Sequence, residues 1–319
     1  MIKSILFLLD LASFILTPLV AGIVALQSRM GANRFPFTFK VWDAFGVSPI
    51  RHHYYQPVFN VNQLSEHLWD QADPLLGINL NLEKQLSLLR SFTYKKELAE
   101  IPIGKSSNSS SISYDYHNRM FGQADAEILY NVVRHFKPTR VIEVGAGYST
   151  RMMKLALDTN RNEGVAAKHS CIEPYENPWL EELGIDEAIR ERVEDVNLEI
   201  FDELKQNDIL FIDSSHVLRT GGDVFTEYLH IIPKLNPGVL VHIHDIFLPY
   251  EYPRKWIVNK RQFWTEQYLL QAFLAFNSEF EVLLSVNYLA KQYPNELSGA
   301  CPFFGRLKGG HGSFWIRRK

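Results

Sequence analysis

A regular alternation of short apolar runs and amphipathic segments constrains the fold more than any other feature of this chain. From about residue 114, strand-like runs alternate with helix-like segments; the runs are RVIEVG, HSCIEPY, RVEDV, DILFIDSSH, GVLVHIHDI, FEVLLSVNYL and GSFWIRR. Strands that alternate with helices predict a mostly parallel sheet covered on both faces. We therefore expect an α/β domain built on a doubly wound, mostly parallel, seven-stranded sheet.

Three parts are predicted along the chain. Residues 1–30 form an apolar, membrane-prone segment, and residues 31–110 form a helical and aromatic extension. The serine-rich run GKSSNSSSIS marks the clearest break in the pattern. The alternating domain is expected over residues 111–319, and a chain of 319 residues is long enough to bury a large core.

The N-terminal apolar run, residues 5–26, contains one charged residue, Asp10. About 20 apolar residues span a bilayer, so the run predicts a membrane anchor. Lys3 precedes the run while Arg29 and Arg34 follow it, which would leave the large domain on the cytoplasmic face. Asp10 and Pro18 argue against a span, and the alternative is an apolar helix packed on the protein or in a dimer interface.

Composition excludes some classes of function. The formal net charge of −3 gives no overall basic field, so we expect no nucleic-acid partner. The two cysteines, Cys171 and Cys301, make neither a disulfide framework nor a cysteine-built metal site. A reducing compartment, the cytoplasm, fits this cysteine usage best.

Glycine or polar residues follow most of the predicted strands. In a doubly wound sheet, ligands bind beyond the carboxyl ends of the strands, so these positions are the candidate site. They are Gly145, Ala146, Gly147, Glu173, Asp195, Asp213 to His216, His244 and Asp245.

The first strand end indicates the kind of ligand. Two glycines, Gly145 and Gly147, let the backbone approach a ligand closely, and a helix is expected to start near Ser149. Thr150 replaces the third glycine of a dinucleotide fingerprint, and Glu143 is suited to accept from a cationic amine. Glu173, at the second strand end, is placed to bind both hydroxyls of a ribose. These carboxylates favour a nucleoside with a cationic amino-acid tail.

The stretch Glu143-Val144-Gly145-Ala146-Gly147 resembles the first motif of the class I S-adenosylmethionine-dependent methyltransferases, which have a Rossmann-like fold, and Glu173 resembles their ribose-binding acid. The resemblance covers about residues 124–318, and the run DSSH…HIHDIFLPYEYP resembles a bacterial group within the family. It implies S-adenosylmethionine as cofactor, with Asp195 near the adenine. The cofactor residues it implies are Glu143, Gly145, Ala146, Gly147, Tyr148, Ser149, Glu173, Asp195 and Asp213.

Asp213 and Asp245 are expected at adjacent strand tips, with His216 close to the first. Two converging carboxylates either hold a hard divalent cation or leave one of them as a base. The arrangement resembles Mg²⁺-dependent small-molecule O-methyltransferases, which implies Asp213 and Asp245 as ligands of Mg²⁺ or another divalent cation. Ile246 stands where that group has an amide ligand, so the implied metal site is incomplete.

His216 is the predicted general base, because an unperturbed histidine titrates near 6.5. Asp245 or a bound cation would orient the acceptor, and His244 lies near enough to the strand tip to reach it. The alternative role for His216 is a helix-start residue. His242 is expected to be a hydrogen-bonded core residue.

Two loops are candidates for the walls of the site. Tyr116, Asn118 and Phe121 precede the first strand, where they form either a lid or the packing of an entry helix. The run FLPYEYPRKW follows the fifth strand and forms either an acceptor wall or a rigid core loop.

The sequence predicts a methyltransferase that acts on an oxygen of a small molecule, sugar or lipid-linked glycan. A non-catalytic, membrane-tethered scaffold that retains the cofactor fold is the alternative, and a nicotinamide-dependent oxidoreductase is a weaker one. The acceptor stays open because loops that vary within one fold build acceptor pockets. The oligomeric state also stays open.

Overall fold

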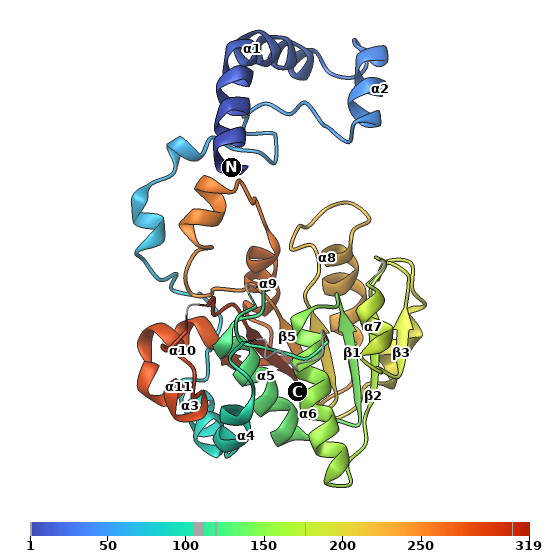
Figure 1. Ribbon diagram of the computed structural model, residues 1–319, viewed down its shortest axis with the longest axis vertical. Helices are drawn as coiled ribbons and strands as arrows, with labels where there is room; N and C mark the ends of the chain where they lie inside the picture. Colours follow the sequence, from blue (N-terminus) through green and yellow to red (C-terminus); the bar gives the residue numbers. More distant parts are fainter. Residues whose placement is uncertain (1, 105–111, 119, 176, 308) are drawn as a thin grey trace. The chain divides into compact units, whose positions relative to one another are not determined.

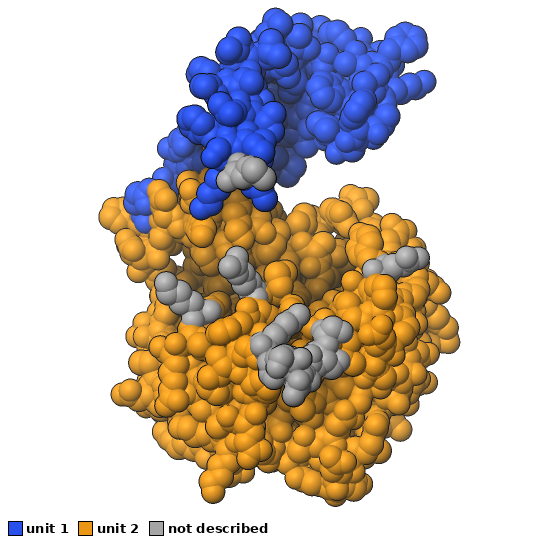
Figure 2. Space-filling view, viewed as in Figure 1, with its two compact units in different colours: residues 1–66 blue, residues 67–319 orange. Residues whose placement is uncertain are grey.

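The computed structural model describes residues 2–104, 112–118, 120–175, 177–307 and 309–319. The chain forms two compact units, residues 1–66 and residues 67–319 (Figure 2). The short 3-10 helix η2 (Glu66–Trp69) spans the division.

The first unit is built on the long helix α1 (Ile2–Met30), followed by α2 (Pro36–Ala44) and the 3-10 turn η1 (Val61–Gln63) (Figure 1). The indole N–H of Trp42 donates a hydrogen bond to the amide oxygen Oε1 of Gln27 at 2.8 Å, which connects α2 to α1. The apolar side chains of α1 are exposed within the unit. An 18-residue window of α1 has a mean hydropathy of 2.1, so the helix is long and apolar enough to cross a membrane, by length and composition only.

The second unit holds a seven-stranded sheet with the order β3-β2-β1-β4-β5-β7-β6. Strands β1 to β5 run parallel, and β7 is antiparallel to both of its neighbours. The predicted doubly wound, mostly parallel seven-stranded sheet is confirmed. The strands are β1 (Arg140–Val144), β2 (Lys168–Ile172), β3 (Glu187–Ile189), β4 (Ile209–Ile212), β5 (Leu240–Ile243), β6 (Phe280–Ser285) and β7 (Phe314–Arg318).

Two strands differ from the sequence prediction. The third strand is Glu187–Ile189, and the predicted run at residues 192–196 forms a turn instead. Val193 and Val196 are both buried there, and their spacing of three suits a turn rather than the period of two of a strand. The predicted run FEVLLSVNYL is a strand only to Ser285, after which α10 begins.

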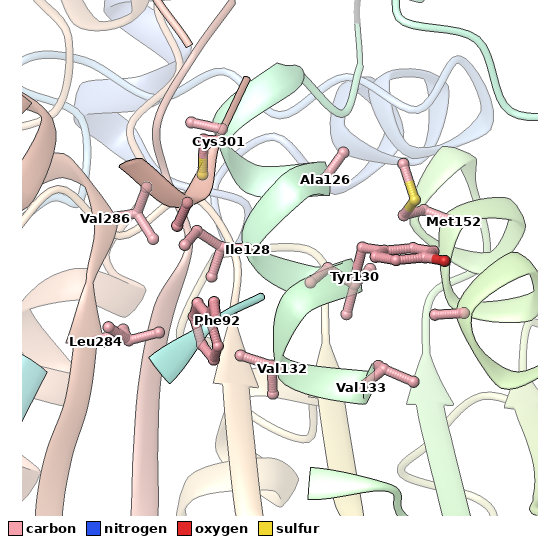
Figure 3. Packing of buried hydrophobic residues seen from close by; sticks show 14 of the residues in the cluster. Phe92, Ala126, Ile128, Tyr130, Val132, Val133, Met152, Leu284, Val286 and Cys301 are labelled. Atoms are coloured by element: carbon pink, nitrogen blue, oxygen red, sulfur yellow. The ribbon is translucent and has the colours of Figure 1, made fainter. Parts of the chain in front are cut away.

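Successive residues of each strand point to opposite faces, and each face has its own apolar core. Val141 belongs to one core and Ile142 to the other. Figure 3 shows the first core, in which α5 side chains such as Ile128 and Val132 lie near Leu284 of β6. The helices whose residues join this core are α3 (Leu82–Ser91), α4 (Lys95–Glu100), α5 (Gln123–Phe136), α6 (Tyr148–Asn162), α10 (Val286–Gln292) and α11 (Pro294–Ala300).

The opposite face is covered by shorter helices. The second core contains residues of η3 (Leu198–Glu203), α8 (Asp223–Thr226), η4 (Glu227–Ile231), η5 (Ile232–Lys234) and α9 (Glu266–Leu274). The remaining elements are α7 (Pro178–Glu182) and η6 (Lys255–Asn259). Both η4 and η6 are π-helices, which are rare and frequently mark functional sites.

The compact unit begins well before residue 111, the predicted start of the alternating domain. Leu86 and Leu89 of α3 are buried in the first core, and Gln85 Oε1 accepts a hydrogen bond from the backbone of Ser285 at 2.8 Å. Residues 67–104 therefore complete the cover of the sheet instead of forming a separate extension. Most of the serine-rich run chosen as the boundary, residues 105–111, lies outside the described residues.

Candidate active site

The turn from β1 to α6 requires glycine at its first position. Gly145 has φ +85, and a Cβ there would overlap the carbonyl oxygen of Asp213. Gly147 differs, because a Cβ added there would meet no described atom within 4 Å. The backbone at Gly147 is therefore open to a ligand at the start of α6.

Glu173, directly after β2, joins its own loop to this turn. Its two carboxylate oxygens accept from the backbone N–H of Ala146 at 3.0 Å and of Tyr175 at 2.9 Å. Its place beside the glycine turn was predicted from the order of the strands. Its contact with a ribose stays a prediction.

Glu143 lies fully buried on the face of the sheet that α6 covers. The Ser149 hydroxyl donates to Oε1 at 2.7 Å, and His169 Nε2 lies 3.1 Å from Oε2. Both oxygens already have partners inside the protein. A direct contact of Glu143 with a cationic amine, and one of Ser149 with the cofactor, stay predictions, and this geometry favours a role in holding the glycine turn. Tyr148 is half-buried at the first position of α6.

Asp195 lies in an exposed turn beyond β3, where its carboxylate accepts from Arg192 Nε at 2.8 Å. The structure does not bring it directly after a strand, because β3 ends at Ile189. Its predicted place near an adenine is untested.

His216 stands among three carboxylates at the tips of β4 and β5. Its Nδ1 lies 2.8 Å from Glu266 Oε2, and its Nε2 lies 3.4 Å from Asp213 Oδ1 and 3.8 Å from Asp245 Oδ2. His216 and Asp245 have φ of +61 and +55, a left-handed conformation that is uncommon for residues other than glycine. Such conformations cluster at functional sites, where the surroundings hold them in place.

These neighbours determine the protonation of His216. Burial disfavours its charge, but the hydrogen bonds to Asp213 and Glu266 raise its pKa well above the usual value. The expectation of an unperturbed pKa near 6.5 is therefore wrong, because Glu266 arrives from α9, far along the chain. Burial also works against ionised Asp213, yet the charges of His244 and His216 lower its pKa to about 2.

Asp245 and His244 differ from that pair. Burial raises the pKa of Asp245, and the nearby carboxylates Asp213 and Asp125 add to the rise. His244 Nε2 lies 3.6 Å from Asp245 Oδ1. Burial opposes the charge of His244, but Asp213 and Asp245 raise its pKa. Environments that push the pKa values of Asp213 and Asp245 apart are typical of acid–base sites.

A cavity of about 720 Å³ opens over this cluster. Its lining includes the buried residues His244 and Asp125 and the half-buried Asp245. Among the described lining residues, neither Asp213 nor His216 appears. The cavity therefore meets Asp245 and His244 directly, and His216 only through Asp245.

The predicted wall loops contribute in part. Tyr116 and Asn118 line the cavity, while Phe121 is buried beside His244 with ring centroids 5.1 Å apart. In the run FLPYEYPRKW, Phe247 to Tyr252 is mostly a buried loop and Trp256 lines the cavity. His242 is the expected core residue, because it is fully buried and its Nε2 lies 3.0 Å from Ser313 Oγ.

Several lining residues were not predicted. Asp125, at the start of α5, accepts from the backbone N–H of Gly312 at 3.0 Å and of Ser313 at 2.9 Å. A Cβ at Gly312 would lie 2.9 Å from Asp245 Oδ1, so glycine keeps that approach open. The closely spaced glycines of the run KGGHGS, residues 308–313, were the sequence feature that could have indicated this part of the site. Nothing in the local pattern marked several other lining residues, among them Lys260, Gln262, Trp264 and Arg306.

A larger cavity of about 920 Å³ lies among residues of α4, α5 and α6, including Glu97, Tyr130 and Leu155. None of the predicted site residues is among its described lining residues. Of these two cavities, the smaller one is lined by carboxylates and a histidine at the strand tips, as far as the described residues show.

The residues present fit a divalent cation poorly. Ile246, at the position of the missing amide ligand, is buried in the second apolar core. Nε2 of His216 lies against both Asp213 and Asp245, where a cation would need to approach their oxygens. The predicted metal role of these two aspartates therefore has no support in this geometry.

Comparisons with known proteins bear on the family of this chain. A family model described as a methyltransferase domain matches residues 142–246. An uncharacterised protein of Archaeoglobus fulgidus is 30% identical over 168 residues, which cover 49% of this chain and 73% of that protein.

Two solved structures are also similar. The O-methyltransferase TomG from Streptomyces achromogenes, in complex with S-adenosylmethionine, is 15% identical with a TM-score of 0.37, covering 72% of this chain and 88% of that one. An O-methyltransferase from Bacillus cereus, in complex with S-adenosylhomocysteine, is 13% identical with a TM-score of 0.37, covering 73% and 91%. The family assignment rests on the domain model and the archaeal relative: the chain belongs to the methyltransferase-domain family.

Proposed function

We propose that this methyltransferase transfers the methyl group of S-adenosylmethionine to a hydroxyl oxygen of an acceptor. The acceptor is a small molecule, a sugar or a lipid-linked glycan. The observation that carries the proposal is a cavity that meets Asp245 and His244 at the tip of β5, two strands from the glycine turn. The cofactor supplies an electrophilic methyl group on a sulfonium. The protein has to align the acceptor and take its proton.

For the cofactor, the open backbone at Gly147 and the carboxylate of Glu173 are the proposed contacts. Gly147 has room for a ligand, and Glu173 can accept ribose hydroxyls beside its two backbone bonds. Tyr148, Asp195 and Asp213 are further proposed contacts. Glu143 would act through the Ser149 hydroxyl, by holding the start of α6.

For the proton, we place the general base at Asp245. It lines the cavity, and burial raises its pKa above the usual value of an aspartate. His216, predicted first as the base, is instead a positioning residue in this proposal. Glu266 fixes its Nδ1, and its Nε2 faces Asp245. His244 is placed to hydrogen-bond the acceptor, and no step requires a divalent cation.

The test is the Asp245→Asn variant, assayed for transfer of labelled methyl and for cofactor binding. Loss of a general base lowers kcat by roughly 10²–10⁴-fold, and cofactor affinity should not change. An unchanged kcat would show that Asp245 is not the general base. If transfer is absent from the wild type while cofactor binds, the non-catalytic scaffold is the better account.

The role of His216 has its own readout. The charge of His216 lowers the pKa of Asp245, so His216→Gln should move the acid limb of the pH–rate profile to higher pH. A purely structural role would lower kcat without moving that limb.

We also propose that α1 anchors the protein to the cytoplasmic face of a membrane. Its length and hydropathy support this, and so do Arg29 and Arg34, which follow the apolar run. A lipid-linked acceptor would fit an enzyme held at that surface.

A further inference from the structure

Two tryptophans form one wall of the acceptor cavity. Trp256 lies in the π-helix η6, and its ring centroid is 5.1 Å from that of Trp264 at an interplanar angle of 73°. Trp264 also lies over His216, with ring centroids 4.4 Å apart. Both indoles line the cavity and are half-buried, so they present apolar faces to a ligand directly beside the proposed catalytic cluster.

Two cations lie at the open side of the same cavity. Lys260 is the C-cap residue of η6, and its Nζ lies 5.6 Å from the centroid of the Trp256 ring. Arg306 lies in the segment after α11. Both are exposed. Within the described part of the chain, no carboxylate forms an ion pair with either of them. Their charges are available to a ligand.

The two acidic residues of the cavity, in contrast, already have partners within the protein. Asp125 uses both carboxylate oxygens on the backbone of Gly312 and Ser313, and Asp245 lies beside His244 and His216. The cavity is thus polarised, with paired acids in its buried part and unpaired cations at its mouth. A hydroxyl group of a ligand can donate to the acids in the inner part, and an anionic group can pair with the cations at the mouth.

The volume and the remaining polar groups narrow the ligand further. A cavity of about 720 Å³ lies within the roughly 300–1,000 Å³ range of small-molecule sites. Gln262 lines it with an amide group that can donate and accept, and its Oε1 has no hydrogen-bond partner among the described residues. Apolar indole faces combined with several hydrogen-bonding groups suit a ring that carries several hydroxyls.

We propose that the acceptor is a saccharide unit that bears an anionic group, a carboxylate or a phosphate, bound by Lys260 and Arg306 while a ring hydroxyl faces Asp245. This inference rests on the proposed function of the cavity and names the substrate class for it.

The test uses the full chain saturated with S-adenosylhomocysteine, titrated with glucuronic acid, glucose 6-phosphate and methyl glucoside and followed by ligand-observed NMR. The two anionic sugars should bind at least about tenfold more tightly than the neutral one, the effect of gaining a charge-assisted contact. Comparison of the two anionic sugars distinguishes a carboxylate from a phosphate.

Lys260→Ala and Arg306→Ala should each reduce that preference by about tenfold, because each removes one cation. Lys255→Ala is the matched control, since Lys255 begins the same π-helix but is not among the lining residues, and it should change nothing.

Equal binding of methyl glucoside, no binding of any probe, or an unchanged preference in both variants would overturn the inference. A parallel calorimetric titration with S-adenosylhomocysteine distinguishes a wrong substrate class from a wrong proposed function. If that titration succeeds and the sugar test fails, only the substrate class is wrong. If that titration shows no binding, the proposed function itself fails.

Discussion

At the residue scale, Gly145 and Gly147 are glycine for different reasons. Gly145 has a left-handed backbone and no room for a side chain beside Asp213. Gly147 has φ −163, which any residue adopts, and open space around it. Gly145 is therefore required by the backbone conformation and packing of the turn, whereas the open space at Gly147 allows a ligand to approach the backbone.

This difference predicts opposite results for two alanine variants. Gly145→Ala should lower the free energy of unfolding by about 2–4 kcal/mol, from left-handed strain plus overpacking. Gly147→Ala should unfold like the wild type but lose affinity for S-adenosylmethionine. Chemical denaturation and calorimetry measure the two effects. A destabilised Gly147→Ala protein, or one that binds normally, would contradict the assignment of Gly147 to ligand approach.

Residues next to strand ends were predictable, while their protonation was not. Glu173 and the glycine turn follow their strands directly, so the order of the strands places them together. His216 depends on Glu266, which the chain supplies from α9. No local pattern carries that pairing, so the sequence could assign His216 only the pKa of an isolated histidine.

At the element scale, α5 links the sheet to the C-terminal segments through buried carboxylates. Asp125 holds the start of β7 through Gly312 and Ser313, and Glu127 Oε1 accepts from the backbone of Phe303 at 2.8 Å. The other oxygen of Glu127 is buried without a hydrogen-bond partner among the described residues. Burial therefore raises the pKa of Glu127 to about 8.

A raised acid pKa makes stability depend on pH with a definite sign. The folded chain keeps the Glu127 proton up to about pH 8, while the unfolded chain releases it near 4.5. The contribution is complete below 4.5 and is lost as pH rises to 8, with a slope of up to about 1.4 kcal/mol per pH unit. Glu127→Gln cannot ionise, so its free energy of unfolding should fall less over this window.

Glu163→Gln is the matched control for urea denaturation at several pH values. Hydrogen bonds to Arg134 and Lys137 lower the pKa of Glu163 to about 2, so its pH dependence lies below 4.5. The variant should keep the wild-type slope between pH 5 and 8. An unchanged slope in Glu127→Gln would show that Glu127 is ionised in the folded protein.

The long periodic elements were predicted well, and the short ones were not. Helix α5 and strands β1, β4 and β5 lie where the apolar pattern placed them. Strand β3 has only three residues, at the sheet edge. Its position depends on pairing with β2, from Ser170 to Ile172, which local pattern does not encode.

At the scale of the whole molecule, the chain joins a methyltransferase unit to a unit dominated by α1. The apolar surface of α1 is exposed within its own unit. Exposed apolar area of that extent marks a membrane or protein partner.

Membrane association predicts a clear response to charge in α1. Ile15→Lys places a cation in the middle of the apolar run, at a cost of roughly 2.5–3.5 kcal/mol for insertion. The full chain should sediment with anionic lipid vesicles, and the variant should remain largely in the supernatant. Asp10→Ala, which removes the only charge in the run, should sediment at least as well as the wild type. Wild-type protein that stays in the supernatant would exclude the anchor.

We propose that the second unit binds S-adenosylmethionine at the glycine turn for methyl transfer. Calorimetric titration of the full chain with S-adenosylmethionine tests it most directly, with NAD as the comparison ligand and Glu173→Ala as the comparison variant. We expect saturable binding of one S-adenosylmethionine per chain, no binding of NAD, and loss of binding in Glu173→Ala. Absence of heat with S-adenosylmethionine, or saturable heat with NAD instead, would contradict it.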